Sequence, residues 1–280
     1  MWSRLLVGLL CFPFVSLQSI RGEISGGVDA SPNSFPFMLR LHIRGAKGRE
    51  GRCAGSLIHK KFFISALHCF SEVFDFWRHC LRRGTTNNRC YAVVREHFVN
   101  SFDEGEVKIN IVNIYEAPSE NNDLVVGELE RPVVLDSKAQ TIAVSSAPLT
   151  PGDLVTTAGW GLSGPSGRLS NVLRRTDLEV SVGGEGEIVK TKVGRSKSGA
   201  PIDPCEGDSG GPLLKWSDAL DSFVLHATLN GGGYDCFHNS TDGDGIWNSV
   251  FPYTTWIENF VKGEKKESMF FFYFFSISSR

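Results

Sequence analysis

The sequence lacks a strong excess of charge of either sign. Its 280 residues carry a formal net charge of −2, so it has no global attraction to nucleic acid or to acidic membranes, and we expect no nucleic-acid partner. It also lacks a long apolar run. The two strongest candidates, residues 5–15 and 269–275, are both shorter than the roughly 20 residues that a membrane-spanning helix needs.

Paired Cys-x-x-Cys spacing, which is typical of zinc sites, is also absent. The sequence therefore predicts no metal site, and we expect no cofactor. Of the seven cysteines, Cys11 falls in the N-terminal apolar run. The other six suggest three disulfides in an oxidising compartment, with about fifteen pairings open on sequence alone. These six are Cys53, Cys69, Cys80, Cys90, Cys205 and Cys236.

The N-terminal segment indicates secretion. In residues 1–19 an arginine precedes an apolar run, followed by small and polar residues, the pattern of a secretory signal peptide. We therefore expect an extracellular or secretory-granule protein, with Asn239 of the sequon Asn239-Ser240-Thr241 glycosylated in a surface loop. The chain also carries an aromatic-rich tail of unknown role at 263–280.

Strand-like patterns dominate the chain. Apolar and polar residues alternate in 37–44, 107–112 and 223–230, which is the period of half-buried strands. Short strands between clusters of Gly, Pro, Asn and Ser favour an antiparallel all-β protein over alternating strands and helices. One helix is predicted where Trp256, Ile257, Phe260 and Val261 recur at helical spacing. Residues 182–200, rich in Gly, Lys and Ser, are predicted to form a long exposed loop.

The segment Gly207-Asp208-Ser209-Gly210-Gly211 surrounds a serine with flexible backbone. A serine hydroxyl is a weak nucleophile, so it needs a neighbouring base and N–H donors aimed at the oxygen that becomes negative. Gly207, without a Cβ, can turn its N–H together with that of Ser209 toward one point. This predicts Ser209 as a nucleophile beside an oxyanion hole; the alternative is a flexible turn with a solvated serine.

The order of candidate base and acid separates two hydrolase classes. His68 ends an apolar run, and Asp123 opens a strand-like segment before Ser209. The order His, Asp, Ser is that of the chymotrypsin-like triad, whereas α/β-hydrolases have Ser, acid, His. That second order would require His226 or His238. His226 lies between apolar neighbours on a predicted strand, so we expect it to be structural.

Several segments in shared order resemble the secreted trypsin-like serine proteases of the chymotrypsin family, over about residues 24–261. They are Ile24-Ser25-Gly26-Gly27, Cys53-Ala54-Gly55-Ser56-Leu57-Ile58, Ala66-Leu67-His68-Cys69, Asp123-Leu124, Ala158-Gly159-Trp160-Gly161, Cys205-Glu206-Gly207-Asp208-Ser209-Gly210-Gly211-Pro212 and Pro252-Tyr253-Thr254-Thr255-Trp256-Ile257. The resemblance implies two antiparallel six-stranded β-barrels with a C-terminal helix. The first barrel would contribute His68 and Asp123, and the second Ser209. It also implies the disulfides Cys53–Cys69, Cys80–Cys90 and Cys205–Cys236.

The resemblance further implies a primary specificity pocket. Asp203 would lie at its floor and select Arg or Lys, with walls formed by Asn230, Gly232 and Gly245. Three residues depart from the family pattern: Pro204 stands where a small hydroxyl residue or alanine is usual, Asn230 replaces a serine, and Gly231 replaces a tryptophan.

Activation is implied at Ile24, whose free amine would pair with Asp208 and order the oxyanion loop. Glu23 precedes Ile24, where trypsin-like zymogens commonly carry a basic residue. Gly22-Glu23 resembles the dipeptide pro-segments of granzyme-like proteases, although Arg21 offers a tryptic cut upstream. The resemblance therefore implies a short pro-segment at 20–23 and one protease domain at 24–262.

We therefore expect a secreted serine endopeptidase that cleaves after Arg or Lys through an acyl-enzyme. Its partners would be protein or peptide substrates, with protein protease inhibitors as further candidates, and we expect a monomer. The alternative is a catalytically silenced homologue that acts as a secreted binding or regulatory module. The His68, Asp123 and Ser209 set favours the enzyme.

Overall fold

The structure is a computed structural model that describes residues 27–44, 50–70, 80, 90–101, 103–119, 122–162, 168–195, 201–231 and 244–262. Its first half forms a closed barrel in the order β2-β3-β4-β7-β6-β5. The strands are β2 (Met38–Arg44), β3 (Glu50–His59), β4 (Phe62–Ala66), β5 (Cys90–Val94), β6 (Val107–Glu116) and β7 (Leu124–Leu129). All neighbours in this barrel are antiparallel, and the pairing of β2 with β5 closes it.

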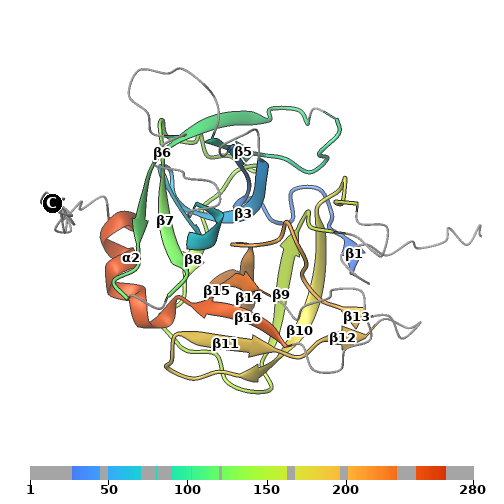
Figure 1. The fold of residues 1–280 in the computed structure, drawn as a ribbon, viewed down its shortest axis with the longest axis vertical. Coiled ribbons are helices and arrows are strands. Elements are labelled where there is room, and N and C mark those ends of the chain that lie inside the picture. Colours follow the sequence, from blue (N-terminus) through green and yellow to red (C-terminus); the bar gives the residue numbers. More distant parts are fainter. Residues whose placement is uncertain are drawn as a thin grey trace, which may run out of the picture.

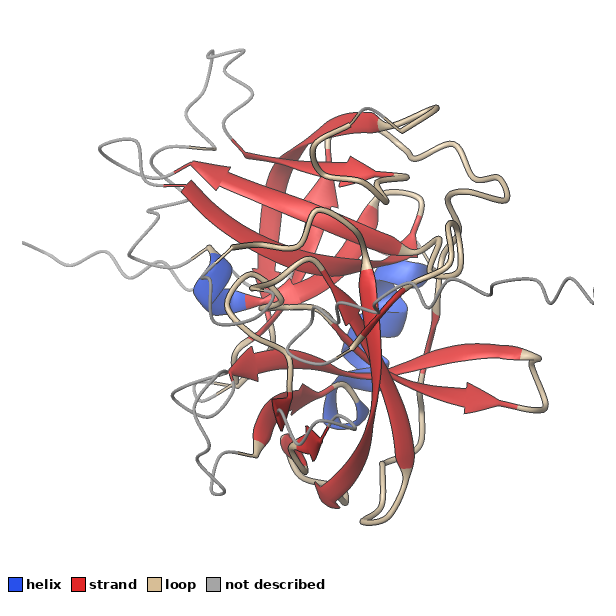
Figure 2. Ribbon diagram, turned by 90° about the vertical axis from the view of Figure 1, so that its right-hand side faces the viewer, coloured by secondary structure: helices blue, strands red, loops and turns tan. Residues whose placement is uncertain are grey.

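A second barrel follows the order β10-β11-β16-β15-β14-β9 and closes where β9 pairs with β10. Its strands are β9 (Leu154–Gly159), β10 (Arg174–Val182), β11 (Ile188–Thr191), β14 (Pro212–Ser217), β15 (Ser222–Gly231) and β16 (Gly245–Ser249). β1 (Val28–Asp29) extends the sheet beside β10, and β8 (Ala143–Val144) lies parallel to β15. β12 (Gly194–Arg195) and β13 (Pro201–Ile202) form a separate ribbon. Two antiparallel six-stranded barrels are thus confirmed (Figure 1 and Figure 2).

The predicted strand patterns appear as β2, β6 and β15. In β2 the apolar side chains Leu39, Leu41 and Ile43 are buried, as the alternation predicts. In β15 both faces are buried, and His226 and Thr228 lie inside with their apolar neighbours. Side chains of β15 belong to two different apolar clusters, one of which continues into the first barrel. Because β15 packs on both sides, alternation there does not separate core from surface.

The prediction of a long exposed loop over residues 182–200 is wrong. This region contains β11, which lies between β10 and β16 and completes the second barrel. Val189 and Thr191 are buried, whereas Lys190 between them is partly exposed. With only two inward side chains, a strand this short gives too weak a period to stand out against its Gly- and Lys-rich surroundings.

The predicted C-terminal helix is present as α2 (Thr254–Val261), after the short 3-10 helix η3 (Phe251–Tyr253). Ile257 and Phe260 are buried. The Phe260 ring lies 5.4 Å from that of Phe62 and 5.0 Å from that of Tyr115, ring centre to ring centre. Because both partners belong to the first barrel, the helix that ends the second barrel packs back against the first (Figure 1). Val261, predicted on the apolar face, is 41% exposed at the end of the helix.

Candidate active site

Strand pairing brings His68 and Asp123 together, although 55 positions separate them. His68 lies in the 3-10 turn η2 (Leu67–Cys69), directly after β4, and Asp123 directly precedes β7. β4 and β7 are antiparallel, with Ala66 opposite Leu124, so the end of one strand meets the start of the other. The His68 Nδ1 atom lies 2.7 Å from Asp123 Oδ2.

The Asp123 carboxylate holds the histidine at two points. Its second oxygen, Oδ1, accepts the backbone N–H of His68 at 2.6 Å, while its backbone carbonyl accepts the N–H of Leu67 at 2.9 Å. With Nδ1–H donating to the carboxylate, the other ring nitrogen, Nε2, is left as the acceptor. The imidazole is therefore fixed in position and tautomer, while its side chain remains 40% exposed.

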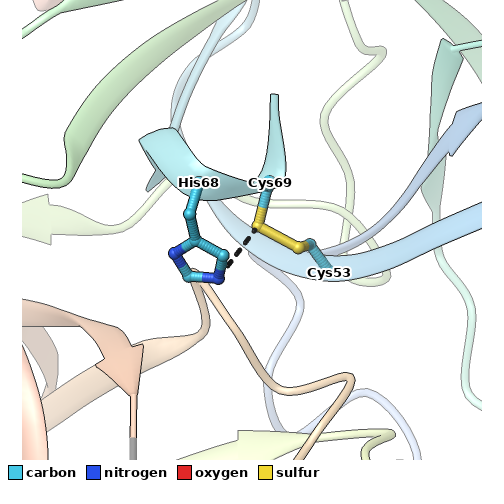
Figure 3. A group of neighbouring side chains, drawn as sticks. All are labelled: Cys53, His68 and Cys69. Atoms are coloured by element: carbon cyan, nitrogen blue, oxygen red, sulfur yellow. Dashed lines mark hydrogen bonds between the residues drawn. A yellow bond between two sulfur atoms is a disulfide. The ribbon is translucent and has the colours of Figure 1, made fainter. Parts of the chain in front are cut away.

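Ser209 comes from the second barrel, in the tight turn that leads into β14. Its carbonyl accepts the N–H of Ala54 on β3 at 2.8 Å, which joins the turn to the first barrel. The Cys69 sulfur lies 3.8 Å from the Ser209 carbonyl oxygen and 4.0 Å from His68 Nε2. Cys69 is disulfide-bonded to Cys53, and Figure 3 shows that Nε2 is the His68 ring nitrogen on the side of this disulfide. The Ser209 backbone and His68 Nε2 thus lie against the same sulfur.

The serine turn leaves two N–H donors free. The N–H groups of Asp208, Gly210 and Gly211 donate to carbonyls at 2.8–2.9 Å. Those of Gly207 and Ser209 donate to no acceptor in the described part of the chain. Gly207 has a φ of +96°, a left-handed conformation that favours glycine. Two N–H donors without an acceptor among the described residues therefore lie on either side of Asp208, at the two positions where the sequence predicts an oxyanion hole.

Gly210 is required for steric reasons. Its φ is +74°, and a Cβ at this position would lie 2.1 Å from Ser65 Oγ and 2.6 Å from the Ala54 carbonyl oxygen. The serine turn is thus packed directly on strands β3 and β4 of the first barrel, and any larger side chain would push it away.

Asp208 lies fully inside the protein, 2% exposed. Its carboxylate accepts the N–H of Gly161 at 2.6 Å and that of Cys205 at 3.0 Å. Burial raises the pKa of Asp208 to about 6, and the two backbone donors oppose that rise. A Cβ on Gly159 or Gly161 would come within 2.0 or 2.3 Å of a carboxylate oxygen. Gly159 and Gly161 of the segment Ala158-Gly159-Trp160-Gly161 therefore make room for the Asp208 carboxylate. Ile24, the expected partner of Asp208, lies outside the described residues.

Asp203 is a second buried acid, 5% exposed. Its Oδ1 atom forms no hydrogen bond within the described residues, and a Cβ on Gly245 would lie 3.3 Å from it. Burial, with repulsion from Asp208 and Asp244, raises the pKa of Asp203 to about 7. The carboxylate thus faces Gly245, a predicted wall residue, and no cationic side chain of the described ranges forms an ion pair with it. Gly232, the other predicted glycine wall, lies outside the described residues.

The structure turns Asn230 toward a residue that the sequence analysis missed. The Asn230 amide donates from Nδ2 to Asn248 Oδ1 at 3.1 Å. Asn248, fully buried on β16, in turn donates from Nδ2 to the Asp123 carbonyl oxygen at 3.0 Å. The available signal was a polar amide at position 248 beside Trp247 in an otherwise core-forming strand.

A shallow hollow adjoins the serine turn at Gly207. Its rim includes Arg52 of β3 and Trp160 and Leu169 of the second half of the chain. Arg40, also on the rim, is neutralised by the buried carboxylate of Glu96, with 2.5 Å between Nε and Oε2. Arg52 is exposed. The surface beside Gly207 is therefore built from both halves of the chain.

Five of the described cysteines form disulfides. Cys53 bonds to Cys69 and Cys80 to Cys90, the pairs that the family resemblance implies. Cys205 is also disulfide-bonded, and its expected partner Cys236 lies outside the described residues. The ligand atoms of Cys53, His68 and Cys69 lie within 4.8 Å of one another (Figure 3). The two sulfurs are bonded to each other, however, so neither is a thiolate that could bind zinc.

No helix in the described ranges is long and apolar enough to cross a membrane. The predicted signal peptide at 1–19, the pro-segment at 20–23, Asn239 and the tail at 263–280 all fall outside those ranges.

Two six-stranded barrels, with a His–Asp pair on one and a glycine-flanked serine on the other, define the class of trypsin-like serine proteases. Comparison with known proteins agrees: the family model named Trypsin matches residues 24–257, and the chain belongs to this family. Human (Homo sapiens) Granzyme M is 30% identical, over 70% of this chain and 75% of that protein. Granzyme-like protein 1 of Rattus norvegicus is 27% identical, over 69% and 77%. Serine protease 1 of Homo sapiens is 26% identical, over 85% and 89%.

Proposed function

We propose that this protein is a serine endopeptidase that cleaves peptide bonds through Ser209, His68 and Asp123. The observation that carries the proposal is the His68–Asp123 pair beside a serine turn with two unused N–H donors. A base held in one tautomer and donors with no other partner are what acyl transfer requires.

In this mechanism Ser209 Oγ attacks the substrate carbonyl carbon as its proton moves to His68 Nε2. The N–H groups of Gly207 and Ser209 bind the resulting oxyanion, and Asp123 stabilises the imidazolium. The C–N bond then breaks, His68 protonates the leaving amine, and an acyl-enzyme remains. Water, deprotonated by His68, attacks this ester, and the departing Ser209 oxygen recovers its proton.

We further propose cleavage after Arg or Lys. A buried carboxylate facing Gly245 supports this, because one of its oxygens has no partner among the described residues and a cationic substrate side chain would supply a counter-charge. Arg would be preferred to Lys if the carboxylate is open to two-point binding. A Cβ at position 245 would lie 2.7 Å from Thr191 Oγ1 and 3.3 Å from Asp203 Oδ1, so glycine keeps a side chain away from the carboxylate.

Activation and location form part of the same proposal. We infer that removal of Gly22-Glu23 frees the Ile24 amine to pair with Asp208, whose buried charge has only backbone donors among the described residues. The signal-peptide pattern and the disulfides support a secreted or granule protein. The sequon Asn239-Ser240-Thr241 supports glycosylation at Asn239. We expect a monomeric domain at 24–262, with protein protease inhibitors among its partners.

Labelling tests the chemistry. The purified protein beginning at Ile24 is incubated with a fluorophosphonate, and the adduct is located by peptide mapping. We expect modification of Ser209, and its loss in His68→Ala. A folded wild type that neither labels nor cleaves any peptide would instead be a silenced homologue.

The activation step is tested with a form of the protein whose N-terminus stays at Glu23. This form should be weakly active, and full activity in it contradicts the activation step.

Specificity is tested separately with peptides that vary only the residue before the cut. We expect wild type to prefer Arg and Lys, and Asp203→Ser to lose that preference. A wild type that prefers Phe, Leu or Ala, or a mutant that keeps the Arg preference, rules out Asp203 as the selector.

A further inference from the structure

An amide pair links the predicted substrate-binding strand to the acid of the triad. Asn230 lies near the end of β15, and its Nδ2 donates to Asn248 Oδ1 at 3.1 Å. Asn248 on β16 then donates to the Asp123 carbonyl oxygen at 3.0 Å. This chain of two hydrogen bonds crosses from the second barrel to the segment before β7 in the first.

The second hydrogen bond fixes the backbone at Asp123. Its carbonyl oxygen accepts two donors, Leu67 N–H from the segment that carries His68 and Asn248 Nδ2 from the opposite barrel. The Asn248 side chain is fully buried, so water cannot take over this role. Removing it leaves a carbonyl lone pair without its partner in the interior and loosens the backbone that aims the carboxylate.

The first hydrogen bond fixes the direction of the second. The two ends of an asparagine amide have similar shapes but opposite polarity. If the Asn248 amide turned over, its oxygen would face the Asp123 carbonyl oxygen and repel it. The Asn230 donor on Oδ1 prevents this, because only the observed orientation satisfies both contacts.

The backbone of β15 explains why Asn230 points this way. Leu229 pairs with Trp247 and Gly231 pairs with Ile246 across the β15–β16 ladder, so Asn230 is an extra residue without its own partner. Such a bulge turns a side chain away from the regular alternation. Here the amide of Asn230 reaches Asn248.

We propose that Asn248, oriented by Asn230, is a positioning residue that holds Asp123 and thereby the His68 imidazole. The kinetic part of this inference rests on the proposed protease function, but the geometric part does not. The pair also ties the end of the substrate-binding strand to the catalytic acid, so a change at position 230 acts on the acid without touching it.

The test compares Asn248→Ala, Asn230→Ala, the double variant and Asn248→Thr, which keeps a hydroxyl donor. Thr156→Val is the matched control. Thr156 is buried in the second barrel, and its hydroxyl donates to Asp177 at 2.6 Å rather than to Asp123 or the serine turn. All proteins are first matched for folded fraction by thermal denaturation.

The first readout is the low-field proton NMR signal of His68 Nδ1–H, which reports the hydrogen bond to Asp123 without any turnover. We expect Asn248→Ala to broaden this signal or speed its exchange with water at least fivefold. Asn230→Ala should act in the same direction and add little in the double variant, since the two residues work as one unit. Asn248→Thr should recover part of the effect, and Thr156→Val should match wild type.

The second readout is steady-state cleavage. We expect kcat of Asn248→Ala to fall about tenfold, the loss of one net hydrogen bond, with KM within about twofold. A wild-type NMR signal in both Asn248→Ala and Asn230→Ala overturns the inference even if the protein is an active protease. If Asn248→Ala does not fold, Asn230→Ala and Asn248→Thr decide alone. A wild type without labelling at Ser209 overturns the proposed function, while the NMR comparison still decides the positioning role.

Discussion

Replacing Asp203 by Asn should stabilise the folded protein, and the gain should grow with pH. Asn has nearly the same shape but no charge, so it removes the cost of burying a carboxylate that has no counter-charge in the part of the chain that the structure describes. In the same variant, cleavage after Arg should be lost. Asp203 would then lower the free energy of unfolding while providing the charge that binds a substrate Arg side chain.

The magnitude follows from the pKa of Asp203, which burial and the neighbouring acids raise from 3.8 to about 7. Below pH 3.8 the carboxyl is protonated in both states and contributes nothing. Between pH 3.8 and about 7 the unfolded chain has lost a proton that the folded chain retains, so the free energy of unfolding falls as the pH rises. At about 1.4 kcal/mol per pH unit, the ionised carboxylate costs up to about 4 kcal/mol above pH 7.

Thermal denaturation of wild type and Asp203→Asn from pH 4 to 8.5 measures this difference. At roughly 2–4 °C per kcal/mol, we expect the variant to melt on the order of 10 °C higher at pH 8.5 and within about 2 °C of wild type at pH 4. An amidinium compound such as benzamidine should raise the melting temperature of wild type far more than that of the variant. Asp218→Asn, in an exposed turn, is the control for loss of one negative charge. A difference between wild type and Asp203→Asn that is independent of pH refutes the reasoning.

Three further predictions test other parts of the site. His68→Ala and Ser209→Ala should each remove most peptide cleavage, and the double variant should be no worse than either, because the two residues act as one unit; additive losses in kcat/KM contradict this. Gly210→Ala should cost several kcal/mol in urea denaturation, because its Cβ would meet Ser65 Oγ and the Ala54 carbonyl. The control is Gly152→Ala, which has a φ of +92° but nothing within 4 Å and should cost only about 1–2 kcal/mol; equal losses would show that the contact is unimportant. Replacing Cys53 and Cys69 together by Ala should lower the free energy of unfolding by about 2–5 kcal/mol, and an unchanged urea midpoint would contradict this.

The sequence predicts most of the strands because the alternation of apolar and polar residues within a strand reports directly on which of its side chains are buried. The alternation in 37–44 reports directly on β2, since Leu39, Leu41 and Ile43 face one interior. The short strand β11 gives no such signal, because its place in the barrel depends on an irregular pairing with the preceding strand β10 and on pairing with β16, which is far away in sequence. Strand β15 is recognised as a strand, but the burial of His226 and Thr228 on its second face depends on packing from elsewhere in the chain and is not encoded in its own period.

The site shows the same division. Glycines around Ser209 mark the turn from sequence alone, because few other residues tolerate a φ of +96° or +74°. The reason for the glycines at 159 and 161 is visible only in three dimensions, where they make room for the Asp208 carboxylate. The sequence does not reveal the role of Asn248, because this residue acts through a hydrogen bond to the Asp123 carbonyl, 125 positions away in the chain. One amide residue in a buried strand does not identify its partner.

The two buried acids of the second barrel are electrostatically linked. Asp208 raises the pKa of Asp203, so any group that neutralises Asp208 eases the ionisation of Asp203. If the Ile24 amine pairs with Asp208 as proposed, processing of the N-terminus also removes part of the repulsion at the pocket floor. The same cut that orders the serine turn would then increase the affinity of the pocket for a cationic side chain. By linkage, a bound Arg side chain would stabilise the inserted N-terminus to the same extent, so activation and substrate binding reinforce each other through a single pair of carboxylates.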